Sequence, residues 1–465
     1  LSSGPQVRIL QEAFKNLNFI ITLLFLENLF KDYSEKGKFL FFTGLFFLPS
    51  ALPIAIIFLL FSLIISFRDN QNNYLNDKLN LFFYLAFFLI ILSSLINFFN
   101  VNSINNLSNN SSLTFLGLSN WLPHIIIFIG FQKYLVTNLD RKKCMIAFLS
   151  GSIPVIFSCF SQSILNWHGP MKTFFGLIVW YQRPLDDISS ITGLFSNPNY
   201  LGSWLNIIWP FCLAFIIFEN NNIYKSIFKK LLTISVFVLI LLTASRAALL
   251  GLVLSLPFMY LIFKSKYRNW INSISLLIIF IFINLSFPLF GIKFQELLRG
   301  IIPKGIWINF TSLGFESLDI SRIDIWKQTL RLIWDQPLWG YGSCSFPALF
   351  QTQTGLWKGH SHNLPLELMV SYGIPATLFL LIPIIYLFCK GYLKLFVLNT
   401  HINKYTIIDK AWLVSLSLLI FMQLIDIQYF DGKISITCWI LLAGTRNILL
   451  NKDNYQNREN LFETI

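Results

Sequence analysis

Three side chains at the edges of apolar runs have the chemistry to handle a phosphorylated substrate. Arg246 lies in TASRAALLG, between two apolar stretches, and Arg322 follows Ser321 in SRIDIWKQTLRLIWDQP. An arginine near membrane depth is expensive and needs an anionic partner. His362 lies in KGHSHNLPLELMVSYGIP, just before another apolar run. Because the guanidinium fork matches phosphate oxygens bidentately, this set favours a phosphate or pyrophosphate ligand.

Helix-start signals surround His362. Asn363 suits a cap position and Pro365 suits a first helical turn. Free backbone N–H groups at such a start favour an anion, and the helix dipole favours a neutral imidazole. GLFSNPNYLG, residues 193–202, places Asn-Pro at a second predicted helix start. We therefore predict catalytic roles for His362, Arg322 and Arg246, and substrate-binding roles for Asn197, Asn199, His360, Asn363, Glu367 and Asp324.

Each catalytic candidate also has an ordinary explanation. Arg246 could reach lipid headgroups by snorkelling, and Arg322 could be a solvated charge on a helix surface. His362 could be a loop or capping histidine. As the base, Glu367 and Asp324 are alternatives to His362. The residue types alone leave these readings open.

The segment after Ser321 has the periodicity of an amphipathic helix. Its apolar residues recur three and four apart, which predicts one helical stripe formed by Ile323, Trp326, Leu330 and Ile333. Ser321 with Asp324 resembles a capping box, and Pro337 stops the helix. Such a helix could lie on the outer leaflet of a membrane.

Composition indicates that membrane helices position these residues. The 465 residues are 55% hydrophobic and 12% charged, about half the charged fraction of soluble domains. Apolar runs of membrane-spanning length recur along the chain. We predict an all-α, polytopic integral membrane protein with one transmembrane domain over 1–465. About twelve spans are expected: a hairpin of two helices in 39–67, then 79–99, 113–136, 144–165, 200–218, 230–244, 247–263, 271–291, 364–389, 411–428 and 434–450.

Charge placement predicts the orientation. The net charge of +13 comes from Lys and Arg clusters in alternate loops, which is typical of cytoplasmic loops and not of nucleic-acid binding. Both termini are predicted to be cytoplasmic: an interfacial segment 1–38, with a surface helix at 17–30, and a tail 451–465. Residues 292–364 form the large periplasmic loop, with amphipathic helices. Six cysteines form no CxxC pair, so no metal and no cofactor is expected.

Four stretches in this order resemble the O-antigen ligase and polymerase superfamily of bacterial membrane proteins. They are GLFSNPNYLG, LLTASRAALLGL, SRIDIWKQTLRLIWDQPLWGYG and HSHNLPLELMVSYGIP. The resemblance implies transfer of a glycan from a polyprenyl-pyrophosphate carrier to a hydroxyl of a lipid-linked or glycan acceptor, such as a lipid A core. It places the reaction at the periplasmic face of the inner membrane, without metal. It also implies functional roles for Arg246, Arg322 and His362.

Other functions stay open at this point. An O-antigen polymerase shares the donor and differs in the acceptor. The superfamily also includes a branch named for bicarbonate transport, and a solute transporter would need polar groups at mid-membrane. Asp426 and His124 are the best candidates for such groups within the predicted spans. A flippase would need a tall polar groove, which these apolar helices do not favour.

Overall fold

The computed structural model describes residues 33–68, 77–99, 113–185, 190–217, 223–262, 269, 273, 276–277, 280–281, 283–302, 307–308, 320–398 and 404–450. Within these residues the fold is mostly helical, with one two-stranded antiparallel sheet. The sheet pairs β1 (Met171–Thr173) with β2 (Ile178–Trp180). The predicted segment 17–30 and tail 451–465 lie outside the described residues, as do seven of the 21 residues of the predicted span 271–291.

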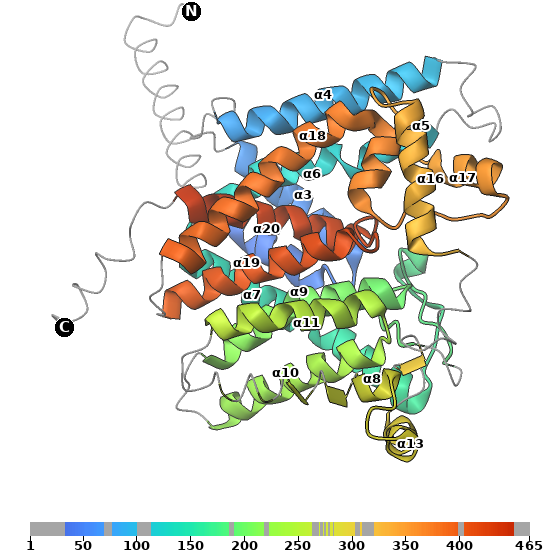
Figure 1. The fold of residues 1–465 in the computed structure, drawn as a ribbon. Coiled ribbons are helices and arrows are strands. Elements are labelled where there is room, and N and C mark those ends of the chain that lie inside the picture. The colour runs from blue at the N-terminus through green and yellow to red at the C-terminus, as the bar shows by residue number, and fades with distance from the viewer. Residues whose placement is uncertain are drawn as a thin grey trace, which may run out of the picture.

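The described helices run side by side over much of the molecule (Figure 1). In chain order they are α2 (Tyr33–Phe47), α3 (Leu52–Arg68), α4 (Lys78–Phe99), α5 (Leu113–Leu116), α6 (Leu122–Phe131), α7 (Asn138–Gly151), α8 (Ile153–Leu165), α9 (Pro198–Ile217), α10 (Ile223–Leu242), α11 (Arg246–Ile262), α13 (Ile292–Ile301), α16 (Arg322–Asp335), α17 (Phe346–Thr354), α18 (Leu364–Tyr392), α19 (Lys404–Gln423) and α20 (Gly432–Leu450).

Membrane-spanning length is reached by seven helical segments of the described chain. They are Lys78–Phe99, Leu113–Leu135, Asn138–Leu165, Pro198–Ile217, Leu364–Leu398, Thr406–Gln423 and Gly432–Leu450. Leu52–Arg68 and Arg246–Phe258 are apolar but shorter. The polytopic all-α class is confirmed at this level, whereas the count of twelve spans stays a prediction.

Several predicted spans differ in detail from the observed helices. The hairpin in 39–67 is confirmed as α2 and α3, joined by a short turn at Pro49. The predicted span at 144–165 lies within the candidate span Asn138–Leu165, which has a break at Ser152 between α7 and α8, with Pro154 in the first turn of α8. This break follows because proline lacks the N–H that a continuous helix needs. The predicted span 411–428 was too long at its end, since α19 ends at Gln423.

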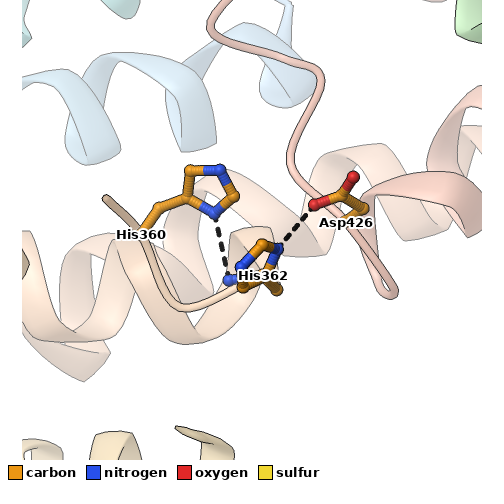
Figure 2. Close-up of side chains that lie close together, drawn as sticks. All are labelled: His360, His362 and Asp426. Carbon is orange, nitrogen blue, oxygen red and sulfur yellow. Dashed lines mark hydrogen bonds and ion pairs between the residues drawn. The ribbon is translucent and has the colours of Figure 1, made fainter. Parts of the chain in front are cut away.

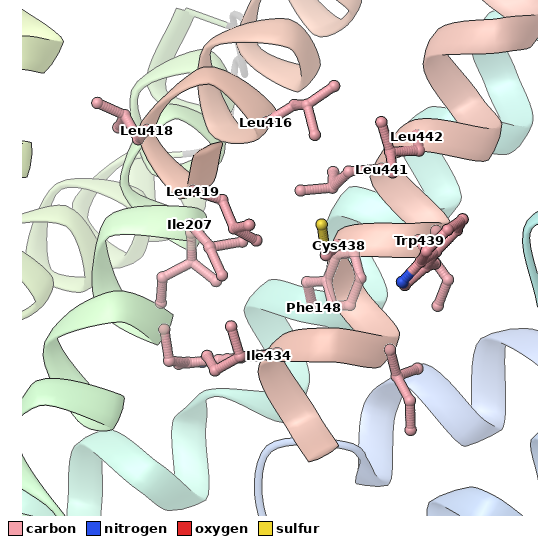
Figure 3. Close-up of a cluster of buried hydrophobic side chains, with 14 of the residues drawn as sticks. Phe148, Ile207, Leu416, Leu418, Leu419, Ile434, Cys438, Trp439, Leu441 and Leu442 are labelled. Atoms are coloured by element: carbon pink, nitrogen blue, oxygen red, sulfur yellow. The ribbon is translucent and has the colours of Figure 1, made fainter. Parts of the chain in front are cut away.

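A large apolar core holds the central helices together. Figure 3 shows part of it, where Phe148, Ile207, Leu416 and Trp439 converge from α7, α9, α19 and α20. These four side chains are almost fully buried. Burial of such apolar surface is favourable by about 25 cal/mol per Å², and it fixes the helix ends from which the loops emerge.

One end of the bundle is crossed by α16 (Figure 1). The predicted stripe, which we expected to face the outer leaflet, is mostly not the side of α16 that packs within the described residues. Ile323 and Leu330 are 61% and 53% exposed, while Ile325, Thr329, Leu332 and Ile333 are buried. The buried set packs with Phe346, Leu349 and Phe350 of α17 and Val370 of α18. Neighbouring helices, rather than the helix's own periodicity, decide which face is covered.

The turn that follows α16 packs against a kink in α18 at Gly373. Gly373 has φ +84°, and a Cβ atom there would overlap the Leu338 carbonyl. Only glycine avoids this clash at a positive φ. Ile374 N donates to Pro337 O at 2.8 Å, and Tyr341 N donates to Val370 O at 2.8 Å. The end of α16 is thereby tied by its backbone to α18.

Candidate functional site

A short loop before α18 holds the two candidate histidines. Asn363 caps α18, and its Oδ1 accepts from Leu366 N at 3.1 Å. His362 has φ +56°, a left-handed conformation that costs a non-glycine residue about 1 kcal/mol or more. Its backbone N donates to His360 Nδ1 at 3.2 Å. The cap and this turn together direct both imidazoles to the same place.

His362 pairs with an aspartate from a distant segment. Its Nδ1 lies 2.7 Å from Asp426 Oδ1, with the Asp426 side chain 5% exposed and that of His362 27% exposed. Figure 2 shows the His362 ring between His360 and Asp426. Asp426 lies in the turn between α19 and α20. One face of the pair is therefore buried, and the other can meet a substrate.

The second oxygen of Asp426 extends this contact to two further elements. Asn199 Nδ2, on the first turn of α9, donates to Asp426 Oδ2 at 2.9 Å. Ser245 Oγ, just before α11, donates to Asn199 Oδ1 at 2.7 Å. A chain of hydrogen bonds thus joins His362, Asp426, Asn199 and Ser245. Arg246 follows Ser245 directly and begins α11, so this chain brings α11's start to the site.

The two arginines interact with each other electrostatically, and Arg322 also acts on Asp426 and His360. Arg246 and Arg322 are both half-buried. Among the residues that the structure describes, Arg322 makes no hydrogen bond or ion pair. The site therefore brings together all three predicted catalytic residues and carries positive charge suited to a polyanion.

Electrostatics fix the protonation of Asp426. Burial opposes its ionisation, but the His362 hydrogen bond and the nearby positive charge, that of Arg322 included, outweigh burial and hold the pKa of Asp426 below its ordinary value. An ionised carboxylate only accepts hydrogen bonds. His362 Nδ1 must then carry the proton that it donates to Asp426, and in the tautomer that has its only proton on Nδ1 the Nε2 atom is an acceptor.

His360 stays neutral at ordinary pH. Burial, followed by the nearby charges of His362 and Arg322, lowers its pKa to about 4 against the opposing charge of Asp426. Its Nδ1 accepts from His362 N, so its single proton lies on Nε2. The site thus presents His360 Nε2–H as a hydrogen-bond donor beside His362 Nε2, which can act as a base.

The histidines and Asp426 also have the chemistry of metal ligands. One ligand atom from each of His360, His362 and Asp426 lies within 4.8 Å of the others. However, His362 Nδ1 and His360 Nδ1 already have partners within the protein. Two guanidinium groups in the same field would repel a cation. The surroundings favour an anion over a metal.

The remaining predicted binding residues have positions of different kinds. Asn363 Nδ2 donates to Leu424 O at 2.9 Å, tying α18 to the α19–α20 turn. Glu367 is buried and accepts from Ser361 N at 2.8 Å, below the histidine loop. Asp324 stays with its helix cap, where Ser321 Oγ donates to it at 2.6 Å. Asn197 Oδ1 accepts from Asn199 N at 2.8 Å and so shapes the start of α9.

Asp426 is the residue that sequence reasoning misplaced. It entered only as an intramembrane carboxylate for a transporter, inside a predicted span that ends too late. In the structure it lies beyond the end of α19 and contacts His362 and Asn199. The one sequence feature that could have pointed to Asp426 is that it is a carboxylate at the end of an apolar run.

Most residues of this site lie in a segment that matches a known protein family. Residues 231–381 match the family model described as O-antigen ligase. This match supports membership of the O-antigen ligase superfamily. The ligase-family segment is about a third of the chain and contains Arg246, Arg322 and His362. Asn199 and Asp426 lie outside it, on either side. No match was found among curated proteins.

The ligase family is of the membrane glycosyltransferase and ligase type, which agrees with a polytopic chain. At this coarse level the match supports an enzyme in a membrane environment, and lipid-linked glycans are the substrates that the family implies.

Proposed function

We propose that the protein moves a glycan from a polyprenyl-pyrophosphate carrier to an acceptor hydroxyl, such as one on a lipid A core. The reaction takes place at the periplasmic face of the bacterial inner membrane, and the chain ends lie in the cytoplasm. The observation that carries the proposal is the 2.7 Å contact of His362 Nδ1 with Asp426 Oδ1, beside two arginines.

Proton transfer is the role proposed for His362. Its Nε2 accepts the proton of the acceptor hydroxyl, while Asp426 holds the ring and stabilises the imidazolium that forms. Glu367 and Asp324 are less suited to this role, because Glu367 is buried under the loop and Asp324 is held in a helix cap. Geometry thus favours His362 among the three candidate bases.

Bond exchange takes place at the anomeric carbon of the donor sugar. The acceptor oxygen forms a bond to this carbon as the bond from the carbon to the pyrophosphate oxygen breaks. The electron pair leaves with the polyprenyl pyrophosphate, whose added negative charge Arg246 and Arg322 stabilise. Direct displacement inverts the anomeric centre. Fixed guanidinium groups supply the charge that a metal supplies elsewhere, so we propose metal-independent transfer.

Substitution of the arginines tests this proposal. Purified protein in nanodiscs is supplied with a polyprenyl-pyrophosphate-linked glycan and a lipid A–core acceptor. Arg322→Ala and Arg246→Ala are expected to lower the transfer rate by about 10²–10³, with the thermal unfolding midpoint retained. Arg331→Ala removes an exposed charge from the same α16 helix and should leave transfer unchanged. Transfer should also persist with a chelator.

Full activity of Arg246→Ala, Arg322→Ala and His362→Ala would overturn the assignment. The same assay with a second glycan as acceptor separates ligase from polymerase. If neither acceptor is used and proteoliposomes instead take up bicarbonate, the transporter hypothesis replaces transfer.

A further inference from the structure

The surface of α16 carries an apolar strip that no part of the described chain packs against. Ile323, Leu330 and Trp334 are 61%, 53% and 82% exposed. Their spacing of seven and four residues places them on one side of the helix. The buried face with Ile325, Leu332 and Ile333 is a separate side. This helix therefore has two apolar sides, and only one of them is used for packing within the described chain.

The strip leads from the cationic site to an apolar groove. At one end of α16 lies Arg322. At the other end, Leu338 follows Trp334 by four residues, is 60% exposed and lines a groove of about 380 Å³. The groove is lined by apolar residues of the α16–α17 turn and α18: Pro337, Leu338, Ile374, Pro375, Leu378, Phe379 and Ile382.

Backbone contacts hold this groove open beside α18. Ile374 N donates to Pro337 O, and the kink at Gly373 fits against Leu338. Below the kink, Leu378 and Ile382 are 47% and 44% exposed on the candidate membrane span. The groove thus starts at the end of α16 and continues along a helix that crosses the membrane.

We infer that the strip and the groove bind the polyprenyl chain of the donor while the arginines bind its pyrophosphate. This inference rests on the proposed function. The 14 residues of α16 span about 20 Å at 1.5 Å per residue. A long isoprenoid chain covers that distance and still fills the groove, because its head is held at Arg322.

Charge and shape together select this occupant. A membrane phospholipid could fill the groove alone, but nothing would then connect the groove to the cations. An amphiphile with a diphosphate head and one long chain matches the cations, the strip and the groove at once. Each part also suits the bilayer, since an exposed apolar side of an in-plane helix faces the acyl chains.

Donor chain length gives a direct test. Two donors share the glycan and pyrophosphate, and one has a long polyprenyl chain while the other has a short geranyl chain. Leu378→Trp fills the groove. It is expected to raise KM for the long-chain donor about tenfold, the scale of losing one or two methylene contacts, and to leave KM for the short-chain donor unchanged. Ile64→Trp, on a 62% exposed position of α3, is the matched control and should change neither.

Photolabelling of the wild-type protein tests the inference without requiring glycan transfer and without relying on the folding of Leu378→Trp. The wild-type protein is irradiated with a polyprenyl pyrophosphate that has a diazirine at the far end of its chain. Label is expected within residues 374–382, removed by unlabelled polyprenyl pyrophosphate and not by phospholipid. Label elsewhere, equal competition by phospholipid, or an unchanged KM ratio in Leu378→Trp would overturn the inference. Absent transfer with correct labelling would instead count against the proposed function alone.

Discussion

The two ends of α19 each present an aspartate to a cationic partner, and the two pairs differ in almost every other respect. Asp409 lies near the start of the helix and pairs with Arg141, with the two side chains 0% and 1% exposed. Asp426 follows the end of the helix and pairs with His362, which is 27% exposed. One helix thus carries a closed pair and an open one.

The closed pair has matched hydrogen bonds. Arg141 Nε and Nη2 donate to the two oxygens of Asp409 at 2.6 and 2.9 Å, and Nη1 donates to Leu135 O at 2.9 Å. Asn138 Nδ2 adds a fourth contact at 2.9 Å. Burying two charges is tolerated when they are paired and hydrogen-bonded like this. The near-complete burial of Arg141 and Asp409 and their many hydrogen bonds within the protein indicate a structural role for this pair.

The open pair, His362 and Asp426, has additional positive charge nearby, from Arg322. Asp426 faces His362, Arg322 acts electrostatically on Asp426, and Arg322 also acts on Arg246. His362 Nε2 is left as an acceptor once Nδ1 donates to the carboxylate. The comparison indicates that a partly exposed pair with further positive charge beside it can act in catalysis. A fully buried pair whose charges neutralise each other instead stabilises the fold.

Among the substitutions at the two ends of α19, Asp426→Asn is expected to lower the transfer rate the most. The change keeps the shape and the contact with Asn199, but removes the charge that fixes the His362 tautomer. Loss of proton transfer from a positioned base is worth about 10²–10⁴ in rate, so we expect transfer to fall by that amount. The thermal unfolding midpoint should stay near that of the wild type.

Asp431→Asn is the matched control in the same turn. Asp431 Oδ1 accepts from Lys433 N at 2.9 Å at the start of α20, and asparagine caps a helix about as well as aspartate. Transfer should be retained there. Equal losses in both variants would show that the turn, and not the His362 pairing, is what matters.

The second prediction concerns the closed pair. Arg141→Ala leaves Asp409 buried without its main partner, and such a change lowers the free energy of unfolding by about 3–5 kcal/mol. Transfer per folded molecule should be unchanged. The measurements are thermal unfolding in detergent and transfer normalised to folded protein. A double change, Arg141→Met with Asp409→Leu, should recover much of the stability.

Arg446→Ala provides the comparison for a less buried pair. Arg446 Nη2 lies 2.7 Å from Asp77 Oδ2, with side chains 15% and 23% exposed. We expect it to be less destabilising than Arg141→Ala, since solvent reduces what a pair contributes. If Arg141→Ala instead lost transfer and kept its unfolding midpoint, the structural reading of the closed pair would be wrong.

Local signals were readable from the sequence, and long-range pairing was not. Asn363 with Pro365 correctly predicted the start of α18, because capping acts within one helical turn. His362 and Asp426 are 64 residues apart, and no spacing rule connects them. The stripe predicted for α16 did not reveal the second apolar side of this helix, which packs against α17 and α18. Membrane helices were readable from hydropathy, but where each one breaks or ends depends on its neighbours.

The smallest predicted effect is a pH dependence of stability from His360. Its pKa is lowered to about 4, first by burial and then by His362 and Arg322, against Asp426. An unfolded chain binds this proton near pH 6.5. Between these values the unfolded state binds more protons, so stability falls as the pH is lowered from about 6.5 to about 4.

His360→Asn should flatten this part of the profile. The unfolding midpoint is measured from pH 6.5 to pH 4.5 in both proteins, and the slope in His360→Asn should be smaller than in the wild type. His168→Asn changes an exposed histidine and should keep the wild-type slope. Identical slopes in the wild type and His360→Asn would mean that His360 is as well solvated as His168. The open end of α19 would then lack the desolvated, cation-rich character that sets it apart from the closed one.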